Sequence, residues 1–370
     1  MSRVVVLGAG VAGHTAAAFL RRWLGRGDTV TVVSPRPDYN WIPSNIWVGV
    51  GLMEPSQVTF PLAPVYERKG IEFLQAAARE IHPEGDLNDS TPYVVAESAD
   101  GTRSTVHYDF LINATGPELR FDKTEGLGPD GGHSLSVCQA QHAAGASAAL
   151  DEEVERMRRG ERRRFLIGVG HGTCTCEGAA FEYIVNLEFE LRHRGVRDRA
   201  DITWITNEYE LGDFGMGGMH LRQGGFVTPS SVFNASIFAE RGIDWITRAH
   251  VSKVEAERVL YETLDGGEHE QGFDFAMLLP PFSGVALKAF AAERTSAIAC
   301  SCPAASCAST PTTPPGPTRS GRPRTGRAPT SHRTTATSSR PGSPSLRRTP
   351  SPCRTRAPTA RSSHRRRPGP

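Results

Sequence analysis

The chain has 370 residues, with 42 Lys and Arg against 40 Asp and Glu, a formal net charge of +2, and a length sufficient for two or three domains. Residues 291–370 contain fifteen Arg and one acid, Glu293, and therefore carry a charge of +14, which leaves −12 on residues 1–290. The mild overall basicity is thus no sign that the folded part binds nucleic acid. The sequence shows no signal peptide and no apolar run of the roughly 18 residues that a membrane-spanning helix needs.

The first elements follow a β-α-β pattern. Residues 3–10, "RVVVLGAG", predict a buried strand, and residues 11–27 predict a helix that is closed by Gly27. Residues 29–34, "TVTVVS", predict the second strand of the same unit.

A glycine-rich turn joins this first strand to its helix. Gly8, Gly10 and Gly13 permit a tight turn and a close approach of a pyrophosphate to the helix N-terminus, which predicts dinucleotide binding. The acid expected at the end of the second strand is replaced by Ser34. Because a hydroxyl group still bonds a ribose without the selectivity of a carboxylate, Ser34 does not separate FAD from NAD.

Two later segments carry further signals. Residues 39–51, "YNWIPSNIWVGVG", fit either a buried loop packed on the sheet or a wall against a flat aromatic ring, and the residues alone leave both open. Residues 108–121, "YDFLINATGPELRF", predict a strand that runs into Ala114, Thr115 and Gly116, a pattern typical of flavin enzymes with two dinucleotide-binding domains.

A second β-α-β unit is predicted over residues 162–206. Its strand leads into Gly168, Gly170 and Gly172, and a helix follows Cys176. This loop therefore begins as a phosphate-binding loop and ends as a thiol site.

The predicted fold class is α/β, with two Rossmann-like dinucleotide-binding domains of the disulfide-reductase type followed by a disordered tail. Residues 243–279 add short strands. The expected organisation is a first part of an FAD-binding domain, a second Rossmann-like unit with the thiols, a truncated return to the FAD domain, and the tail: residues 1–120, 121–262, 263–290 and 291–370.

Several stretches together resemble the sulfide:quinone oxidoreductases, flavoproteins related to the disulfide reductases. The matching pieces occur in the family's order between residues 3 and 290: "VLGAGVAG", "IPSNIWVGVG", "NATGPELRF", "SVCQAQHA", "CEGAAFEY", "LGDFGMGGM" and "AMLLPPFSG". The resemblance implies FAD as cofactor, with no metal ligands. The residues implied to contact FAD are Gly8, Gly10, Ala12, Gly13, Ser34, Pro43, Ser44, Ala78, Thr115 and Gly116.

The resemblance also implies the catalytic residues. Cys176 would be the redox thiol, Cys138 the second cysteine, and Glu182 and His142 the proton handlers. Cys176 has a local argument as well, because a helix N-terminus favours the thiolate and lowers a thiol pKa. Cys174 is expected to be a bystander, since a C-x-C pair is too constrained for an easy disulfide.

The implied substrates are sulfide, oxidised to polysulfur on a cysteine pair, and quinone, which takes the electrons from FAD. The expected location is cytoplasmic, or peripheral on the inner face of the plasma membrane, with the family's membrane-docking helices absent here.

Two alternatives to this function stay open. One is an NAD(P)H-dependent FAD oxidoreductase, for which Glu208 is the only acid placed to hold a ribose, and the other is a non-catalytic flavoprotein remnant.

The tail differs in kind from the rest of the chain. After "FSGVALKAF" the composition changes to Arg, Pro, Ser, Thr and Ala, with no Lys and no aromatic residue in residues 291–370. Such a segment cannot bury enough apolar surface to offset its ordering entropy. We expect it to be disordered and to be an out-of-frame translation of GC-rich DNA, which would impair quinone reduction.

Overall fold

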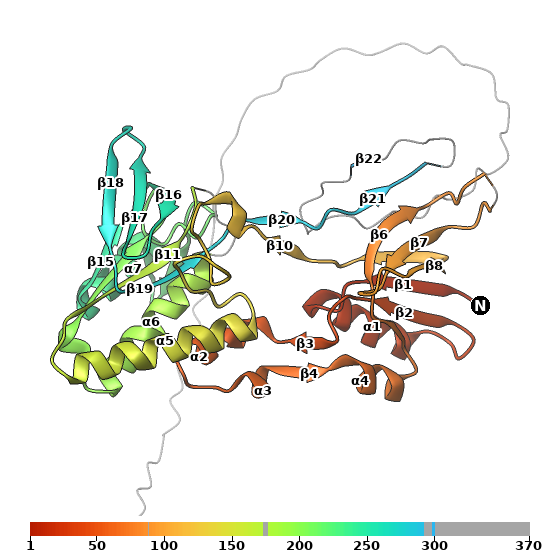
Figure 1. The fold of residues 1–370 in the computed structure, drawn as a ribbon, viewed down its shortest axis with the longest axis horizontal. Helices are drawn as coiled ribbons and strands as arrows, with labels where there is room; N and C mark the ends of the chain where they lie inside the picture. The colour runs from red at the N-terminus through yellow and green to blue at the C-terminus, as the bar shows by residue number, and fades with distance from the viewer. Residues whose placement is uncertain (88, 173–176, 292–297, 300–370) are drawn as a thin grey trace, which may run out of the picture. The chain divides into compact units, whose positions relative to one another are not determined.

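Two four-stranded parallel sheets organise the structure (Figure 1), with strand orders β5-β2-β1-β9 and β15-β12-β11-β19. The computed structural model describes residues 1–87, 89–172, 177–291 and 298–299, which all lie within one compact unit, Met1–Pro311. The predicted α/β class with two Rossmann-like domains is confirmed.

The first half of the chain supplies the first parallel sheet and the sheet that covers it. Its elements are β1 (Arg3–Leu7), α1 (Val11–Trp23), β2 (Thr29–Val33), β3 (Asp38–Asn40), η1 (Ile42–Ser44), α2 (Asn45–Gly49), α3 (Pro55–Val58), β4 (Thr59–Pro61), α4 (Leu62–Lys69), β5 (Glu72–Leu74), β6 (Ala77–His82), β7 (Tyr93–Glu97), β8 (Arg103–His107), β9 (Phe110–Asn113) and β10 (Pro117–Leu119).

The second half supplies the second parallel sheet and the return to the first. Its elements are η2 (Phe121–Lys123), α5 (Ala140–Arg158), β11 (Arg163–Val169), α6 (Glu177–His193), η3 (Arg197–Arg199), β12 (Ala200–Ile205), β13 (His220–Gln223), β14 (Phe226–Pro229), α7 (Ser230–Arg241), β15 (Ile243–Ile246), β16 (Ala249–Val254), β17 (Arg258–Thr263), β18 (Glu268–Gly272), β19 (Phe275–Leu279), β20 (Phe282–Gly284), β21 (Lys288–Ala289) and β22 (Ile298–Ala299). Within the described ranges, no helix combines the length and apolarity needed to cross a bilayer.

Both central strands are buried on two faces, which explains their continuous apolar runs. β1 lies between β2 and β9, with Leu7 paired to Val33 and to Asn113. Helices α1 and α4 cover one face of this sheet, and the sheet of β6, β7 and β8 covers the other. Parallel sheets covered on both faces need apolar side chains at every position of the strand.

The second sheet is covered in the same way. Helices α2, α5 and α6 pack on one face, and the antiparallel strands β16, β17 and β18 pack on the other. β10 and β20 run side by side between the two sheets (Figure 1), with Leu119 paired to Phe282.

Helix α1 ends earlier than predicted. The sequence placed its end at Gly27, but the last helical residue is Trp23. The guanidinium of Arg21 donates to the backbone carbonyls of Leu24 at 3.2 Å and Asp28 at 2.6 Å. A side chain therefore satisfies carbonyls at this helix end, and the glycine is not needed to stop the helix.

The return to the first domain also lies later than residue 263. β19, Phe275–Leu279, is fully buried and pairs with β11, so it belongs to the second sheet. The return begins with β20 and β21, and β21 pairs with β6. Within the tail that was expected to be disordered, Ile298–Ala299 pairs with β21 as β22, which contradicts the expectation for these two residues. Residues 292–297 and 300–370 lie outside the described part of the chain.

Candidate functional site

The first glycine loop leaves open space at the carboxyl end of β1. Gly8 has a left-handed φ of +93°, and a side chain there would collide with the backbone of Ala114. A side chain on Gly13 would collide with the carbonyl of Gly8. Gly10 is exposed, and a Cβ atom built on it meets nothing within 4 Å. Gly8 and Gly13 are therefore required by the chain itself, whereas Gly10 faces the space that a bound group would fill.

The N-terminus of α1 adds the electrostatics of an anion site. Gly10 is the N-cap residue and supplies no side-chain hydrogen bond to the first backbone N–H groups. The first turn carries no acid, and Val11 and Ala12 are exposed. Free N–H groups and the helix dipole together attract phosphate oxygens. The loop therefore fits the pyrophosphate of a dinucleotide such as FAD.

Substitution of Gly13 tests this packing independently of any ligand. Gly13→Ala should lower the free energy of unfolding by about 1–3 kcal/mol, because its methyl group meets backbone that cannot move aside. Gly145→Ala is the matched control, since this exposed glycine in α5 has no atom within 4 Å of its Cβ position. The control should gain up to about 1 kcal/mol. Urea unfolding measures both, and an unchanged midpoint for Gly13→Ala would contradict the packing.

Ser34, Thr115 and Gly116 lie at the same edge of the first sheet, directly after β2 and β9. Ser34 is buried, and its hydroxyl oxygen accepts the backbone N–H of Arg36 at 3.3 Å. The N–H and hydroxyl groups of Thr115 both donate to the Asn113 side chain, at 3.2 and 2.9 Å. Gly116 has a φ of +77° and faces open space. Parallel strands end together at such an edge, where this fold class binds its ligands.

Residues 39–51 are not the loop that was one of the two predictions, because they contain the end of β3, the 3-10 turn η1 and the short helix α2. The side-chain amide of Asn45, which is fully buried, exchanges hydrogen bonds with Asn40 at 2.9 and 3.1 Å and donates to the Val137 carbonyl at 3.1 Å. This network fixes the start of α2 against the segment before α5. A buried side-chain amide with three hydrogen bonds holds this geometry because each bond lost costs about 1–3 kcal/mol.

The outer side of this segment presents apolar groups to solvent. Three large side chains are nearly half exposed: Trp41, Ile42 and Trp47. Of the residues predicted to contact FAD, Pro43 is exposed and Ser44 is buried on η1, and Ala78 is half-buried on β6. The exposed apolar face fits the predicted wall against a ring, and the buried face of α2 belongs to the core.

The second glycine loop is covered by the chain's own side chains. Gly168 would collide with the Ile205 backbone if it carried a Cβ atom. A side chain on Gly170 would meet Leu127, and one on Gly172 would meet the ring of His250. The space that Gly10 leaves open in the first loop is therefore filled at Gly170 and Gly172.

Polar contacts hold this cover in place. The hydroxyl of Thr124 lies 2.7 Å from the Gly170 carbonyl and 2.9 Å from Nδ1 of His171. The rings of His171 and His250 meet edge to face at 5.1 Å. Burial lowers the pKa of His171, and the neighbouring His250 lowers it further. The imidazole is thus biased toward its neutral form and adds no fixed cation for a phosphate.

Glu208, the acid that would hold a ribose in the NAD(P)H-dependent alternative, already contacts other groups of the chain. It is buried, and its carboxylate accepts the backbone N–H of Phe214. It also contacts the buried carboxyl group of Glu177 in the first turn of α6. Sequence reasoning missed Glu177, because a Glu in the first turn of a helix is ordinary and its partner lies on another element.

The structure describes three of the four predicted catalytic residues. Cys138 is half-buried beside the core, and its backbone N–H donates to the Ser136 hydroxyl at 3.1 Å. His142 lies on the first turn of α5, 3.7 Å from the Asp130 carboxylate, and burial lowers its pKa. Glu182 is exposed on α6. The predicted redox thiol Cys176, like its neighbour Cys174, lies outside the described residues.

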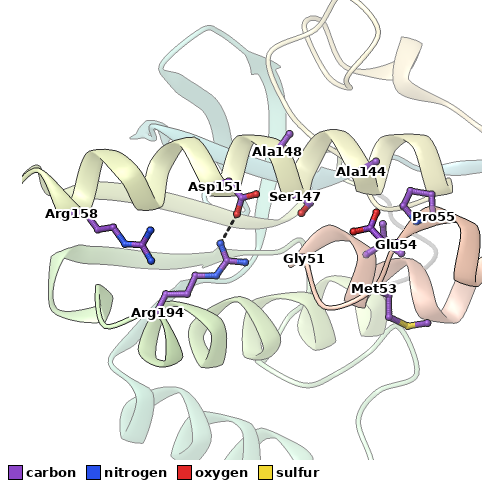
Figure 2. A pocket seen from close by; sticks show the side chains of 11 residues that line it. Gly51, Met53, Glu54, Pro55, Ala144, Ser147, Ala148, Asp151, Arg158 and Arg194 are labelled. Atoms are coloured by element: carbon purple, nitrogen blue, oxygen red, sulfur yellow. Dashed lines mark hydrogen bonds and ion pairs between the residues drawn. The ribbon is translucent and has the colours of Figure 1, made fainter. Parts of the chain in front are cut away.

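A pocket of about 500 Å³ lies elsewhere, between the segment after α2 and helices α5 and α6 (Figure 2). Arg194 and Asp151 point toward one another across it at 2.5 Å, and Arg194 also donates to the Val50 carbonyl at 3.1 Å. None of the predicted cofactor or catalytic residues lines this pocket. Since both of its cations are already paired, Arg194 with Asp151 and Arg158 with Glu155, we assign the pocket no role in the chemistry.

Comparisons with known proteins agree with this geometry. A family model described as pyridine nucleotide-disulphide oxidoreductase matches residues 2–194. The chain is 32% identical over 293 residues to a sulfide-quinone reductase from Aquifex aeolicus strain VF5, which covers 79% of this chain and 61% of that protein.

Solved structures give the same picture. The X-ray structure of the sulfide:quinone oxidoreductase from Aquifex aeolicus matches with a TM-score of 0.64 and 32% identity, over 77% of this chain and 59% of that chain. NDH2 from Plasmodium falciparum, solved in complex with NADH, shares the fold at a TM-score of 0.55 and 16% identity, over 77% of this chain and 56% of that one. The chain spans about three fifths of the length of the sulfide-quinone reductase it matches.

Proposed function

The chain belongs to the pyridine nucleotide-disulphide oxidoreductase family, and on that premise we propose that it is a flavoprotein of the sulfide:quinone oxidoreductase type. The proposed reaction oxidises sulfide to zero-valent sulfur and reduces a quinone. Written with H2S, the sulfur gives up two electrons and two protons, and the quinone takes up both pairs to become a quinol.

One observation supports sulfide rather than NAD(P)H as the electron donor. The chain has two glycine loops, of which the first is open at Gly10 and the second is covered at Gly170 and Gly172. A flavin enzyme that oxidises a nicotinamide needs both sites, whereas one that oxidises a small sulfur compound needs only the first. The covered second loop therefore favours sulfide over NAD(P)H.

FAD is the cofactor that this family binds. In this chain the open loop and the N-terminus of α1 would hold its pyrophosphate, and Ser34 would hold the ribose. When bound, FAD supplies an acceptor for two electrons. The exposed wall of Trp41 and Ile42 would exclude water from one side of a flat ring.

The thiol part of the proposal rests on the segment that precedes α6. A thiolate at Cys176 would be stabilised by the dipole of a helix of 17 residues, which begins at Glu177. Cys138 would receive or carry the growing sulfur chain. His142, whose pKa is lowered by burial, would be neutral at pH 7 and able to accept the proton that sulfide gives up.

We expect this chain to be impaired in the second half of the reaction, the reduction of quinone. The composition of residues 291–370, with fifteen Arg and no aromatic residue, cannot supply an apolar quinone site. An out-of-frame origin for this segment predicts an altered coding DNA after Phe290. The resemblance to the sulfide:quinone oxidoreductases implies peripheral docking on a membrane, and we propose this location, on the inner face of the plasma membrane, for an intact form.

Anaerobic reduction of the purified flavoprotein separates the readings. Sulfide is expected to bleach the flavin, NADH is expected to leave it oxidised, and added quinone should restore the colour slowly or not at all. Bleaching by NADH alone would favour the NAD(P)H-dependent alternative. No bleaching by either reductant, with flavin bound, would favour the non-catalytic remnant.

A further inference from the structure

Two carboxyl groups meet in the interior of the second domain. Glu177 lies in the first turn of α6, and Glu208 lies three residues beyond the end of β12. Both side chains are 5% exposed, and the Glu177 carboxyl group lies close enough to that of Glu208 to raise its pKa. Two ionised carboxylates in this position would repel each other without solvent to screen them.

Among the residues that the structure describes, too few donors reach this pair for two negative charges. The backbone N–H of Phe214 donates to one oxygen of Glu208. Within the described residues, Oε2 of Glu177 and Oε2 of Glu208 are both buried and have no hydrogen-bond donor. A buried carboxyl oxygen without a donor is costly unless a proton is present on the pair.

The charged groups around Glu208 do not stabilise a second negative charge on the pair. From the loop after β12, Asp213 adds a further negative charge. The backbone N–H of Arg248, just before β16, donates to the Glu208 carbonyl at 2.8 Å. The guanidinium of Arg248 lies over the Tyr209 ring at 3.8 Å and donates to the Tyr209 carbonyl instead.

We infer that Glu177 and Glu208 hold one proton between them, and that this shared proton fastens the loop of residues 207–219 to the first turn of α6. The inference is independent of the proposed function, because it concerns the closed state of the second domain and no reacting group. It also gives Glu208 a role other than binding a ribose.

The backbone of the loop of residues 207–219 shows why this loop needs contacts that hold it in place. Phe214 has a left-handed φ of +54°, which is unfavourable for a residue with a side chain. Gly212, Gly215, Gly217 and Gly218 also have positive φ values. Such a backbone keeps one conformation only where side chains hold it. The Phe214 N–H on Glu208 and the Phe214 ring, edge-on to Phe181 of α6 at 5.5 Å, provide this hold.

The protonation chemistry agrees in direction. Burial, and then contact with Glu177, raises the pKa of Glu208 to about 9. A carboxyl group with a raised pKa in the folded state stabilises the fold fully below its unfolded pKa, near 4.5, and loses this contribution as pH rises toward 9. Stability should therefore fall with rising pH across this window.

Glu177→Gln tests the shared proton. The side-chain amide introduced by this substitution would donate directly to an ionised Glu208, so the contact would persist without a proton. Between pH 6 and pH 8 the unfolding equilibrium constant of the wild-type chain should rise relative to the variant, by up to about tenfold per pH unit. Glu152→Gln, an exposed substitution on α5, is the matched control and should follow the wild type.

Urea unfolding of the full chain at fixed ionic strength provides these constants, and parallel pH profiles for wild type and Glu177→Gln would overturn the inference. Infrared difference spectroscopy gives a second readout that does not depend on stability. A carboxylic acid C=O band should titrate with an apparent pKa near 9 in the wild type, titrate at lower pH in Glu177→Gln, and be absent from Glu208→Gln. A band that titrates in both variants as it does in the wild type would equally overturn the inference.

Discussion

Gly10→Val is expected to yield a folded chain that purifies without flavin colour. The first loop leaves open space at Gly10, and an isopropyl group placed there would occupy the position predicted for the pyrophosphate. An overlap of this kind costs roughly 3 kcal/mol, which corresponds to an FAD affinity lower by about 100-fold or more. Absorbance of the purified protein and titration of the apoprotein with FAD measure the loss.

Gly145→Val controls for the general effect of valine in place of glycine. Gly145 is also exposed and also has no atom within 4 Å of its Cβ position, but it lies in the interior of α5. This variant should retain full flavin content. If Gly10→Val keeps the same flavin content as the control, the assignment of the first loop is wrong.

Cys176→Ser is expected to abolish reduction of the bound flavin by sulfide, by at least about 10³-fold in rate, while the flavin content stays normal. A serine hydroxyl is not ionised at neutral pH, even with the help of a helix dipole, and it does not form a persulfide. Stopped-flow absorbance after anaerobic mixing with sulfide measures the rate.

Cys174→Ser is the neighbouring control for this prediction. It changes the same segment by the same atom, and we expect the rate at which sulfide reduces the flavin to stay within a few-fold of wild type. Full turnover in Cys176→Ser, or equal losses in both variants, would remove the thiol mechanism from the proposed function.

Local patterns predicted much of the first domain. The run of Val4, Val5 and Val6 followed by Gly8, Gly10 and Gly13 identified a buried strand and a dinucleotide loop, because strand burial and turn geometry depend on neighbours in sequence. The end of α1 was placed at a glycine for the same local reason. It was wrong because Arg21 reaches forward to carbonyls that its own position does not predict.

The closed second loop could not be predicted from its own residues. Its glycines appear suited to a phosphate, and only the fold brings Leu127 and His250 onto Gly170 and Gly172. The same is true of Glu177 and Glu208, which meet across two elements. Residues that are far apart in the sequence and meet only in the fold produce no recognisable sequence motif.

The end of the second domain shows the same limit. β19 has the continuous apolar run "FAMLL" that any fully buried parallel strand would have, so its residues do not reveal which sheet it joins. Pairing with β11 rather than with the first sheet places it in the second domain. The residues of β19 alone therefore could not show that the return begins after this strand rather than at residue 263.

The central claim is that one loop of this chain is open to a dinucleotide and the other is closed. Calorimetric titration of the FAD-free chain with FAD and, separately, with NADH tests it most directly. We predict that one FAD binds per chain with an affinity that Gly10→Val removes, and that NADH gives no binding heat. Stoichiometric binding of NADH that Gly10→Val leaves unchanged would contradict the claim.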